Sequence, residues 1–493
     1  VPGKKGFSAQ GTDILHVHQV FAALSFRPAA NLRKKSADSV EESKKGGLMG
    51  IELICNHAYA GRAEPKSTYS PQIVNNFTQR IQNGDLPFLS FEYWPELEKE
   101  LFGFKEYLSG FKHMLLLGIG GSALGGRALQ KAFLPSQDLP GHNGPFLWIA
   151  DNVCTDVLEG YMKGLDPAQT VVVVVSKSGG TIETIGQYLL VKEWLKRNLP
   201  ETWNRHLVMV TDPDKGYLRE ETRLLGTRSL PVPKKIGGRY SVLSAVGLLP
   251  AMFMGLECRE IMSGARKTAE GLTADPCGLL SAARPAGIPR LALWARDLIH
   301  AGYSQLIFFV YIPQWACFGQ WFAQLWAESL GKKGKGSTPI PAVGVTDQHS
   351  LQQMFLDGPR DKGCFFLTAE NKPGGRGFSD EIPDKWAFLK GQPFCSLLQA
   401  EALGTRMALT EKQVPLLNAR LDSCSLQAAG ALIVTLEAMT YLTGLLLDIN
   451  PLDQPAVELG KRLANAQLGA DDLQEEKKRL ERFKTQNWEK EEL

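Results

Sequence analysis

The sequence predicts an α/β protein built from two doubly wound parallel-sheet sandwiches in tandem, followed by a C-terminal helical arm. Two observations carry this prediction. Short, continuously apolar runs alternate with longer amphipathic runs over residues 110–250, and the same pattern starts again over residues 290–425. Continuous hydrophobicity indicates strands that are buried on both faces, as in parallel sheets with helices on each side. The length of 493 residues agrees, because roughly 150 residues per domain leaves room for two or three domains.

The individual elements follow from this pattern. Residues 71–108 carry apolar side chains at helical spacing, so we expect helices before the first sheet. The run 313–330 is the clearest helix of the second domain, and the apolar run 425–449 predicts one long helix that stops before Pro451. The strand candidates are residues 113–119, 145–151, 170–176 and 206–212 in the first sheet, and residues 305–312, 339–345 and 364–370 in the second.

These elements divide the chain into five expected regions. They are a poorly patterned leader over residues 1–50, either non-native or extended, a helical N-terminal segment over 51–108 that packs on the second domain, a first α/β domain over 109–255, a second α/β domain over 256–424, and a C-terminal helical arm with a charged tail over 425–493.

Composition limits the classes of function. With 44% hydrophobic and 22% charged residues, the chain is typical of soluble globular proteins. The net charge of +3 is concentrated in residues 1–50, which carry +4, so the rest of the chain sums to −1. A near-neutral body gives no electrostatic reason to expect nucleic acid as a partner. The apolar stretches 240–256 and 428–447 are interpreted as buried helices, so no membrane is expected.

Several site types are not indicated by the sequence. The eight cysteines are scattered singly, with no CxxC pair and no cluster at zinc spacing, so we expect reduced thiols, a cytoplasmic location and no metal. The run GKKGKGST has serine where a P-loop requires lysine. The GxSxG turn of a Ser–His–Asp hydrolase is absent from the sequence.

The first candidate turn is the run LLLGIGGSALGG. It leads from a strand through Gly118 and Gly121 to Ser122 and a helix start, where free N–H groups suit a phosphate. Taken alone, this turn fits a dinucleotide about equally well. The acidic residue that a dinucleotide site places about 20 positions later does not fit, because Asp151 lies 31 positions after Gly120.

The second candidate turn, VVSKSGGTIET, offers the hydroxyls of Ser176, Ser178 and Thr181, with Lys177 adding charge. Such a turn can wrap one phosphate through short hydrogen bonds. The simpler interpretation is a capped helix start, in which Ser and Thr only satisfy backbone N–H groups. Two such turns at the ends of neighbouring parallel strands favour a ligand, because open α/β sheets bind ligands there.

Candidates for proton chemistry lie further along the chain. Arg239 follows two glycines at an expected helix start, where a cation suggests a compensating anionic ligand; the alternative is a surface arginine. Gln324 and Glu328 are four residues apart on one helix and share a face among apolar side chains. A carboxylate in this setting suits a general base, and the alternative is a salt-bridging residue at the rim of the helix.

Two further regions complete the candidate set. His349 follows a strand end, although a lone histidine is usually structural, and Gln454 and Lys461 are expected on nearly the same helical face, unless Lys461 simply faces solvent. Two hydroxyl-rich turns for a phosphate, with a glutamate, an arginine, a histidine and a lysine for proton chemistry, fit an aldose–ketose isomerase. Such an enzyme needs neither a cofactor nor a covalent nucleophile.

Five blocks in order over residues 70–465 resemble one known family. SKSGGTIET, GGRYSVLSAVGL, QLWAESLGK, TDQHS with DGPRDK, and NPLDQPAVELGK closely resemble the bacterial type of the glucose-6-phosphate isomerase (phosphoglucose isomerase) family. The resemblance implies two sugar-isomerase (SIS) domains and a C-terminal helical arm. It implies the interconversion of D-glucose 6-phosphate and D-fructose 6-phosphate, a step of glycolysis and gluconeogenesis, by ring opening and a cis-enediol(ate), with no cofactor and no metal. The leader before residue 50 resembles nothing in the family.

The resemblance also implies roles for individual residues. Glu328 resembles the base that moves the proton between C1 and C2, and Arg239 the residue that stabilises the enediolate. His349 and Lys461 resemble the acid/base groups of ring opening, and family members are homodimers in which the equivalent histidine comes from the partner chain. The expected sugar- and phosphate-binding residues are Gly121, Ser122, Ser176, Lys177, Ser178, Thr181, Gln324 and Gln454.

Three alternatives stay open at this point. A non-catalytic sugar-phosphate sensor would keep the phosphate turns but has no need for the four proton-chemistry residues together. Another SIS-domain phosphosugar isomerase would use the same groups with a different sugar pocket. A nicotinamide-dependent dehydrogenase would produce absorbance changes of its cofactor.

Overall fold

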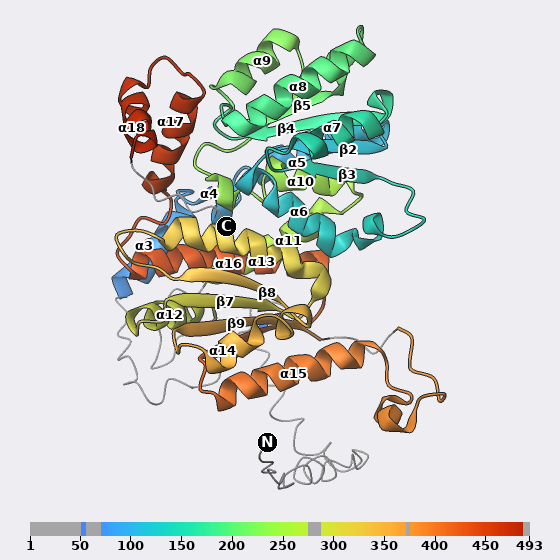
Figure 1. Ribbon diagram of the computed structural model, residues 1–493, viewed down its shortest axis with the longest axis vertical. Coiled ribbons are helices and arrows are strands. Elements are labelled where there is room, and N and C mark those ends of the chain that lie inside the picture. Colours follow the sequence, from blue (N-terminus) through green and yellow to red (C-terminus); the bar gives the residue numbers. More distant parts are fainter. Residues whose placement is uncertain (1–50, 56–70, 275–286, 371–374, 487–493) are drawn as a thin grey trace, which may run out of the picture. The chain divides into compact units, whose positions relative to one another are not determined.

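The computed structural model describes residues 51–55, 71–274, 287–370 and 375–486, so the expected leader over residues 1–50 lies outside the described residues. Two five-stranded sheets with helices on their faces make up the described part of the chain (Figure 1). The predicted α/β class with two parallel-sheet sandwiches is therefore confirmed, with one antiparallel edge strand as an addition.

The first sheet has the strand order β3-β2-β4-β5-β6, and all of its pairings are parallel. All seven residues of β4 are buried, as its continuous run of valines predicts for a strand covered on both faces. β6 was not predicted, because it is a four-residue edge strand that ends at a proline and carries little apolar signal. The strands are β2 (His113–Leu117), β3 (Phe146–Ala150), β4 (Thr170–Ser176), β5 (Leu207–Thr211) and β6 (Arg228–Pro231).

The second sheet has the order β1-β10-β9-β7-β8. Its strands are β1 (Ile51–Cys55), β7 (Gln305–Val310), β8 (Thr338–Val343), β9 (Lys362–Ala369) and β10 (Leu416–Leu421). The helical segment expected over residues 51–108 begins instead with a strand, because β1 pairs antiparallel with β10. That pairing joins segments far apart in sequence, so the helical spacing of the neighbouring residues could not reveal it.

Helices cover both faces of the second sheet (Figure 1). On one face, Phe308 and Phe365 belong to the same apolar cluster as α13 and α16; on the other, Phe309 and Phe366 pack with residues of α14 and α15. The helices are α3 (Pro71–Gln82), α4 (Pro87–Ser90), α5 (Trp94–Ser109), α6 (Leu124–Phe133), α7 (Thr155–Gly164), α8 (Ile182–Asn198), α9 (Tyr217–Leu225), α10 (Ala245–Phe253), α11 (Cys258–Ala274), α12 (Gly287–His300), α13 (Ala316–Leu330), α14 (Gln352–Asp357), α15 (Cys395–Glu411), α16 (Leu426–Leu446), α17 (Glu458–Gln467) and α18 (Gln474–Lys484).

One apolar core connects the two sandwiches. Met114 and Val173 of the first sheet, Phe308 and Leu367 of the second, and Leu432 of α16 all belong to the same cluster of buried side chains. α16 is long and apolar enough to cross a membrane by length and composition, but 89% of its apolar window is buried inside the protein. It is therefore a core helix, as the sequence predicted. The shared core fixes the turns of the first domain against the helices of the second.

Candidate active site

The first candidate turn packs directly against the second domain. The 3-10 turn Gly120–Ser122 follows β2, and Gly120 has a φ of +57°, a conformation that glycine adopts without strain. A Cβ atom on Gly120 would lie 2.8 Å from Nε2 of Gln324 on α13. A Cβ atom on Gly121 would lie 2.3 Å from the Gly238 carbonyl and 2.8 Å from the Arg239 nitrogen. Glycine at both positions therefore allows the Gly120–Ser122 turn, α13 and the Gly238–Tyr240 turn to pack against one another.

Arg239 lies at the centre of this meeting point, in the 3-10 turn Gly238–Tyr240, with 3% of its side chain exposed. Its Nε donates to the Ser329 hydroxyl over 2.8 Å. The guanidinium nitrogens also donate to Glu328 Oε2, Gln454 Oε1, and the carbonyl oxygens of Pro451 and Asp453, over 3.2, 2.8, 2.7 and 3.0 Å. These five bonds use every N–H group of the guanidinium. The alternative of a surface arginine is therefore wrong, and Glu328 of this chain supplies an anionic partner where an anionic ligand was expected.

Glu328 is held from two sides. Its Oε1 accepts a hydrogen bond of 2.9 Å from Nε2 of Gln324, one helical turn earlier on α13, and its Oε2 faces Arg239. In contrast to the guanidinium, 27% of the Glu328 side chain is exposed. The carboxylate borders a cavity of about 500 Å³ that is also lined by Lys332, Asp453 and Gln454. A carboxylate fixed by an amide and a guanidinium at the edge of a cavity can accept a proton from a bound molecule.

The second candidate turn gathers its hydroxyls. Ser176 Oγ lies 3.0 Å from Thr181 Oγ1, and Ser178 Oγ lies 3.4 Å from both. Thr181 is the N-cap residue of α8, yet its hydroxyl makes no capping hydrogen bond. The Ser178 hydroxyl accepts a hydrogen bond of 3.3 Å from the Gly180 nitrogen, so the simpler interpretation, in which hydroxyls satisfy backbone N–H groups, accounts for Ser178 but not for Thr181. The helix end keeps backbone N–H groups for a ligand.

The Lys177 ammonium adds to the electrostatics of this turn. Burial lowers the pKa of Lys177, an effect that Asp212 opposes and Lys215 reinforces. An anion bound in the turn would raise the pKa of Lys177 and so favour its charged form. The two turns are also neighbours: Leu117 of β2 pairs with Val174 of β4, and a Cβ on Gly118 would lie 3.2 Å from the Val175 carbonyl oxygen. Both turns therefore leave the same edge of the sheet.

His349 and Lys461 lie apart from this group. His349 is exposed at the end of the short turn Thr346–Gln348 after β8, and Lys461 is exposed on α17, where it pairs with Glu458 over 2.9 Å. In the described residues, no hydrogen bond or ion pair joins either side chain to Arg239 or Glu328. The structure thus brings together Arg239, Glu328, Gln324, Gln454 and the Gly120–Ser122 turn, but not these two residues.

The expectation that Gln454 and Lys461 share a helical face was wrong. Gln454 precedes the 3-10 turn Pro455–Val457, and α17 begins only at Glu458. The break occurs because Pro451 and Pro455 both disfavour helix in the residue before them. Gln454 therefore belongs to the loop that Arg239 binds, whereas Lys461 belongs to the arm that follows.

Sequence reasoning missed three residues of the cluster. Ser329 links Arg239 to the Tyr240 hydroxyl, which lies 3.0 Å from Ser329 Oγ. Lys332 and Asp453 line the cavity beside Glu328 and form an ion pair of 3.2 Å. The only signal for Lys332 was its place in the glycine- and lysine-rich run after α13, which gave no hint of its partner. In the described part of the chain, no group of three or more His, Cys, Asp or Glu side chains is arranged to hold a metal ion.

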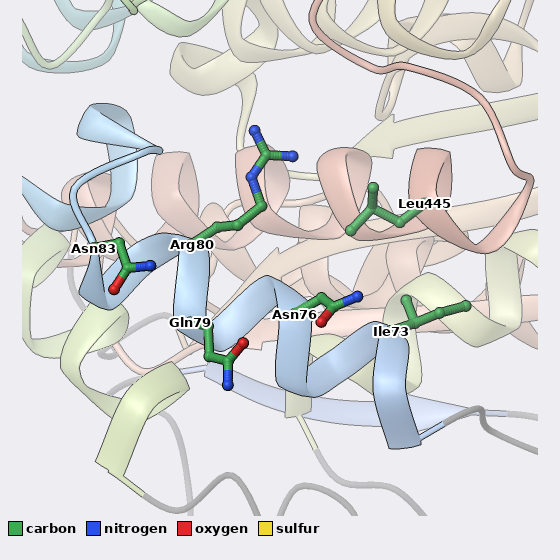
Figure 2. Close-up of a pocket in the computed structure, with 6 residues that line it drawn as sticks. All are labelled: Ile73, Asn76, Gln79, Arg80, Asn83 and Leu445. Carbon is green, nitrogen blue, oxygen red and sulfur yellow. The ribbon is translucent and has the colours of Figure 1, made fainter.

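A second cavity, of about 330 Å³, lies between α3 and α16 (Figure 2). The amides of Asn76, Gln79 and Asn83 on α3 contribute to its lining, and the guanidinium of Arg80 donates to the Tyr441 hydroxyl. None of the candidate residues lines this cavity. Of these two cavities, the one beside Glu328 holds the candidate residues.

Sequence comparisons show which known proteins this chain is similar to. A sequence profile described as phosphoglucose isomerase matches residues 104–360. A protein of Carboxydothermus hydrogenoformans named glucose-6-phosphate isomerase is 34% identical over 445 residues, covering 85% of this chain and 92% of that protein. One of Rubrobacter xylanophilus with the same name is 38% identical over 358 residues, covering 72% and 82% of the two chains.

Solved structures also resemble this chain. A hypothetical protein of Thermus thermophilus has a TM-score of 0.73 and 33% identity, and the match covers 85% of this chain and all of that one. A glucose-6-phosphate isomerase of Chlamydia trachomatis has a TM-score of 0.63 with 21% identity, over 91% and 86% of the two chains, and so supports the fold alone.

Proposed function

Because this chain belongs to the phosphoglucose isomerase family, we propose that it interconverts D-glucose 6-phosphate and D-fructose 6-phosphate by ring opening and proton transfer. The observation that carries this proposal is the pairing of the buried Arg239 guanidinium with the partly exposed Glu328 carboxylate at the edge of a cavity. The relatives with this name cover most of the chain, which favours a sugar 6-phosphate over the other substrates considered, and an enzyme over a sensor.

The phosphate of the substrate would bind in the turn after β4. There the three hydroxyls of Ser176, Ser178 and Thr181 converge in front of the N-terminus of α8, with Lys177 beside them. The dianionic phosphate would gain charge-assisted hydrogen bonds at this position. Binding energy gained there, remote from the reacting carbons, would hold the sugar against the second turn. The sugar itself would contact Gly121, Ser122, Gln324 and Gln454.

Glu328 would then move the proton between C2 and C1. When the carboxylate takes the proton, negative charge passes to the sugar as an enediolate, and the carboxyl becomes a weaker acceptor for Arg239. The guanidinium Nη1 can then redirect its hydrogen bond from Glu328 toward the new negative charge. Since Arg239 is already fixed by four other bonds, this stabilisation requires little reorganisation.

Ring opening would be the work of His349 and Lys461. His349 is exposed, and in the described residues no hydrogen bond or ion pair joins it to Glu328 of its own chain. A residue that completes the active site of a partner chain must be exposed in this way. We propose a homodimer in which His349 crosses the interface. Large exposed apolar side chains on α14, which follows His349, and on the segment leading into α15 supply a surface for such a partner. They are Met354, Trp386, Phe388 and Phe394.

The proposal also includes the cell compartment of the enzyme and whether it needs a metal or a cofactor. Cys154, Cys258, Cys317, Cys364 and Cys424 are free thiols, as expected for a reducing compartment, and we propose that the protein is cytoplasmic. We further propose that the reaction requires no metal and no cofactor, since proton transfer by Glu328 and charge stabilisation by Arg239 supply what an aldose–ketose isomerisation needs.

The test is a coupled assay that detects glucose 6-phosphate formed from fructose 6-phosphate, run with and without a chelator. We expect turnover that the chelator leaves unchanged. Parallel assays with other ketose phosphates check the substrate: turnover of another sugar phosphate with none on fructose 6-phosphate would contradict the proposed specificity. Binding without any turnover would point instead to a sensor.

A further inference from the structure

Lys332 has no role in the proposed chemistry, yet its ammonium is mostly buried and has three partners. It lies two residues beyond the end of α13, and only 10% of its side chain is exposed. Its ammonium donates to the carbonyl oxygens of Ser329 and Asn450 over 2.9 and 2.7 Å, and it lies 3.2 Å from Oδ1 of Asp453. These three partners account for all three hydrogens of the ammonium. Lys332 therefore has no hydrogen left for a substrate.

The loop that Lys332 holds is the loop that Arg239 holds. Arg239 binds the carbonyl oxygens of Pro451 and Asp453 and the side chain of Gln454. Lys332 binds the Asn450 carbonyl and the Asp453 carboxylate. Two mostly buried cations, one from each domain, thus fasten the five residues 450–454 from two sides. The loop forms part of the wall of the cavity that Glu328 borders.

The internal bonds of the loop make this attachment stiff. The second carboxylate oxygen of Asp453 accepts a hydrogen bond of 3.1 Å from the Asn450 side chain, whose own oxygen accepts one of 3.1 Å from the Leu452 nitrogen. Because these bonds link residues at the two ends of the loop, a bond from Lys332 to Asn450 or Asp453 restrains all of residues 450–454. Burial lowers the pKa of Lys332 and Arg239 lowers it further, and Asp453 and Glu328 oppose this lowering only in part.

We propose that Lys332 is a positioning residue for the isomerisation: by binding Asn450 and Asp453, it fixes the loop that presents Gln454 to Arg239 and to the substrate. This inference rests on the proposed function. The position of Lys332 at the end of α13, four residues after Glu328, ties the loop to the same helix that carries the base. Gln454 and Glu328 thereby keep their spacing around the substrate.

The test combines Lys332→Met, Gln454→Ala and the double variant, with Lys335→Met as the matched control. Lys335 also binds a backbone carbonyl after α16, that of Leu447, over 2.6 Å, but it does not touch residues 450–454. We expect Lys332→Met to lower kcat/KM at least about tenfold, and Lys335→Met to leave it unchanged. The double variant should be little worse than Gln454→Ala alone, because both changes remove the same contact of Gln454.

Two results would overturn the inference. Full activity of folded Lys332→Met would remove the positioning role, and fully additive losses would mean that Lys332 acts on the substrate independently of Gln454. If Lys332→Met does not fold, Asp453→Asn removes the charge that Lys332 pairs with and should give the same non-additivity. Hydrogen exchange of the peptide containing residues 447–457 provides a readout independent of catalysis. It should accelerate in Lys332→Met even if the wild-type enzyme proves inactive on fructose 6-phosphate, an outcome that would contradict the proposed function but not the tether.

Discussion

The Arg239 guanidinium donates to Glu328 Oε2 over 3.2 Å, and the two side chains differ in exposure, with 3% of the arginine and 27% of the glutamate accessible. The cation is fixed inside the protein, while the carboxylate faces the cavity. This asymmetry suits proton transfer, because the base can reach a substrate while the charge that stabilises the product of its action stays in place.

The five hydrogen bonds of the Arg239 guanidinium should contribute to catalysis and stability in addition to its positive charge. Arg239→Lys keeps a cation but cannot make all five bonds, so the loop 450–454 and the enediolate lose their common anchor. We expect kcat to fall by about 10²–10³-fold, with a lower melting temperature. Arg259→Lys, an exposed arginine paired with Glu98, is the control and should change neither quantity. A kcat within twofold of wild type for Arg239→Lys would refute this role.

The turn after β4 should bind the phosphate. Removing a hydroxyl that bonds a charged group, in Ser176→Ala or Thr181→Ala, should lower kcat/KM by about tenfold to a hundredfold. Competitive inhibition by inorganic phosphate should weaken in parallel. Ser109→Ala removes an exposed hydroxyl at the end of α5 and serves as the control. If phosphate inhibits the Ser176 and Thr181 variants as strongly as wild type, the phosphate binds elsewhere.

The origin of the histidine can be tested by complementation. His349→Ala should impair turnover of cyclic hexose phosphate more than that of an open-chain analogue, because ring opening precedes proton transfer. A heterodimer of one His349→Ala chain and one Glu328→Gln chain should recover about half of the wild-type activity if His349 acts across the interface, since one intact site then forms. No recovery in the purified heterodimer would place the histidine in its own chain's site, and full activity of the His349→Ala homodimer would place it outside catalysis.

Glu437 gives the protein a distinct pH dependence of stability. It is fully buried in α16, neither carboxylate oxygen has a hydrogen-bond partner in the described residues, and burial raises its pKa well above 4.5. The folded state therefore holds a proton that the unfolded state releases above pH 4.5. The free energy of unfolding should fall as pH rises from that value toward the folded pKa, by up to about 1.4 kcal/mol per pH unit.

Glu437→Gln should remove this slope, because the amide does not ionise. Urea unfolding of both proteins at pH 5.5 and 7.5 measures the difference, and Glu270→Gln, at an exposed position of α11, is the control. An identical pH dependence in wild type and Glu437→Gln would show that the buried carboxyl does not retain its proton.

The strands that could be predicted from sequence are those with a strong local signal. β4 is a run of valines and β7 is almost wholly apolar, so burial on both faces is legible in the residues themselves. β10 was missed because Asn418 and Arg420 interrupt its apolar run, and β1 because its partner is distant in sequence. Those two strands depend on tertiary pairing, which a local pattern does not record.

In the candidate site too, local spacing could be predicted from the sequence, whereas contacts between distant segments could not. Gln324 and Glu328 were expected on one helical face, and the structure places them in direct contact. Gln454 was instead expected on one helical face with Lys461, and the bonds of its loop to Arg239 and Lys332 come from segments more than a hundred residues away. No spacing rule predicts such bonds, because they form only when the two domains share one core. The roles of His349 and Lys461 stay predictions.

The proton carried by Glu328 can be followed directly. Wild-type enzyme incubated with fructose 6-phosphate in D₂O should place deuterium at C2 of glucose 6-phosphate and C1 of fructose 6-phosphate, as read by NMR. Glu328→Gln should keep its fold and its phosphate binding, lower kcat by at least about 10²–10⁴-fold, and lose this exchange to the same degree. Exchange and turnover at the wild-type rate in that variant would contradict the assignment of Glu328 as the base.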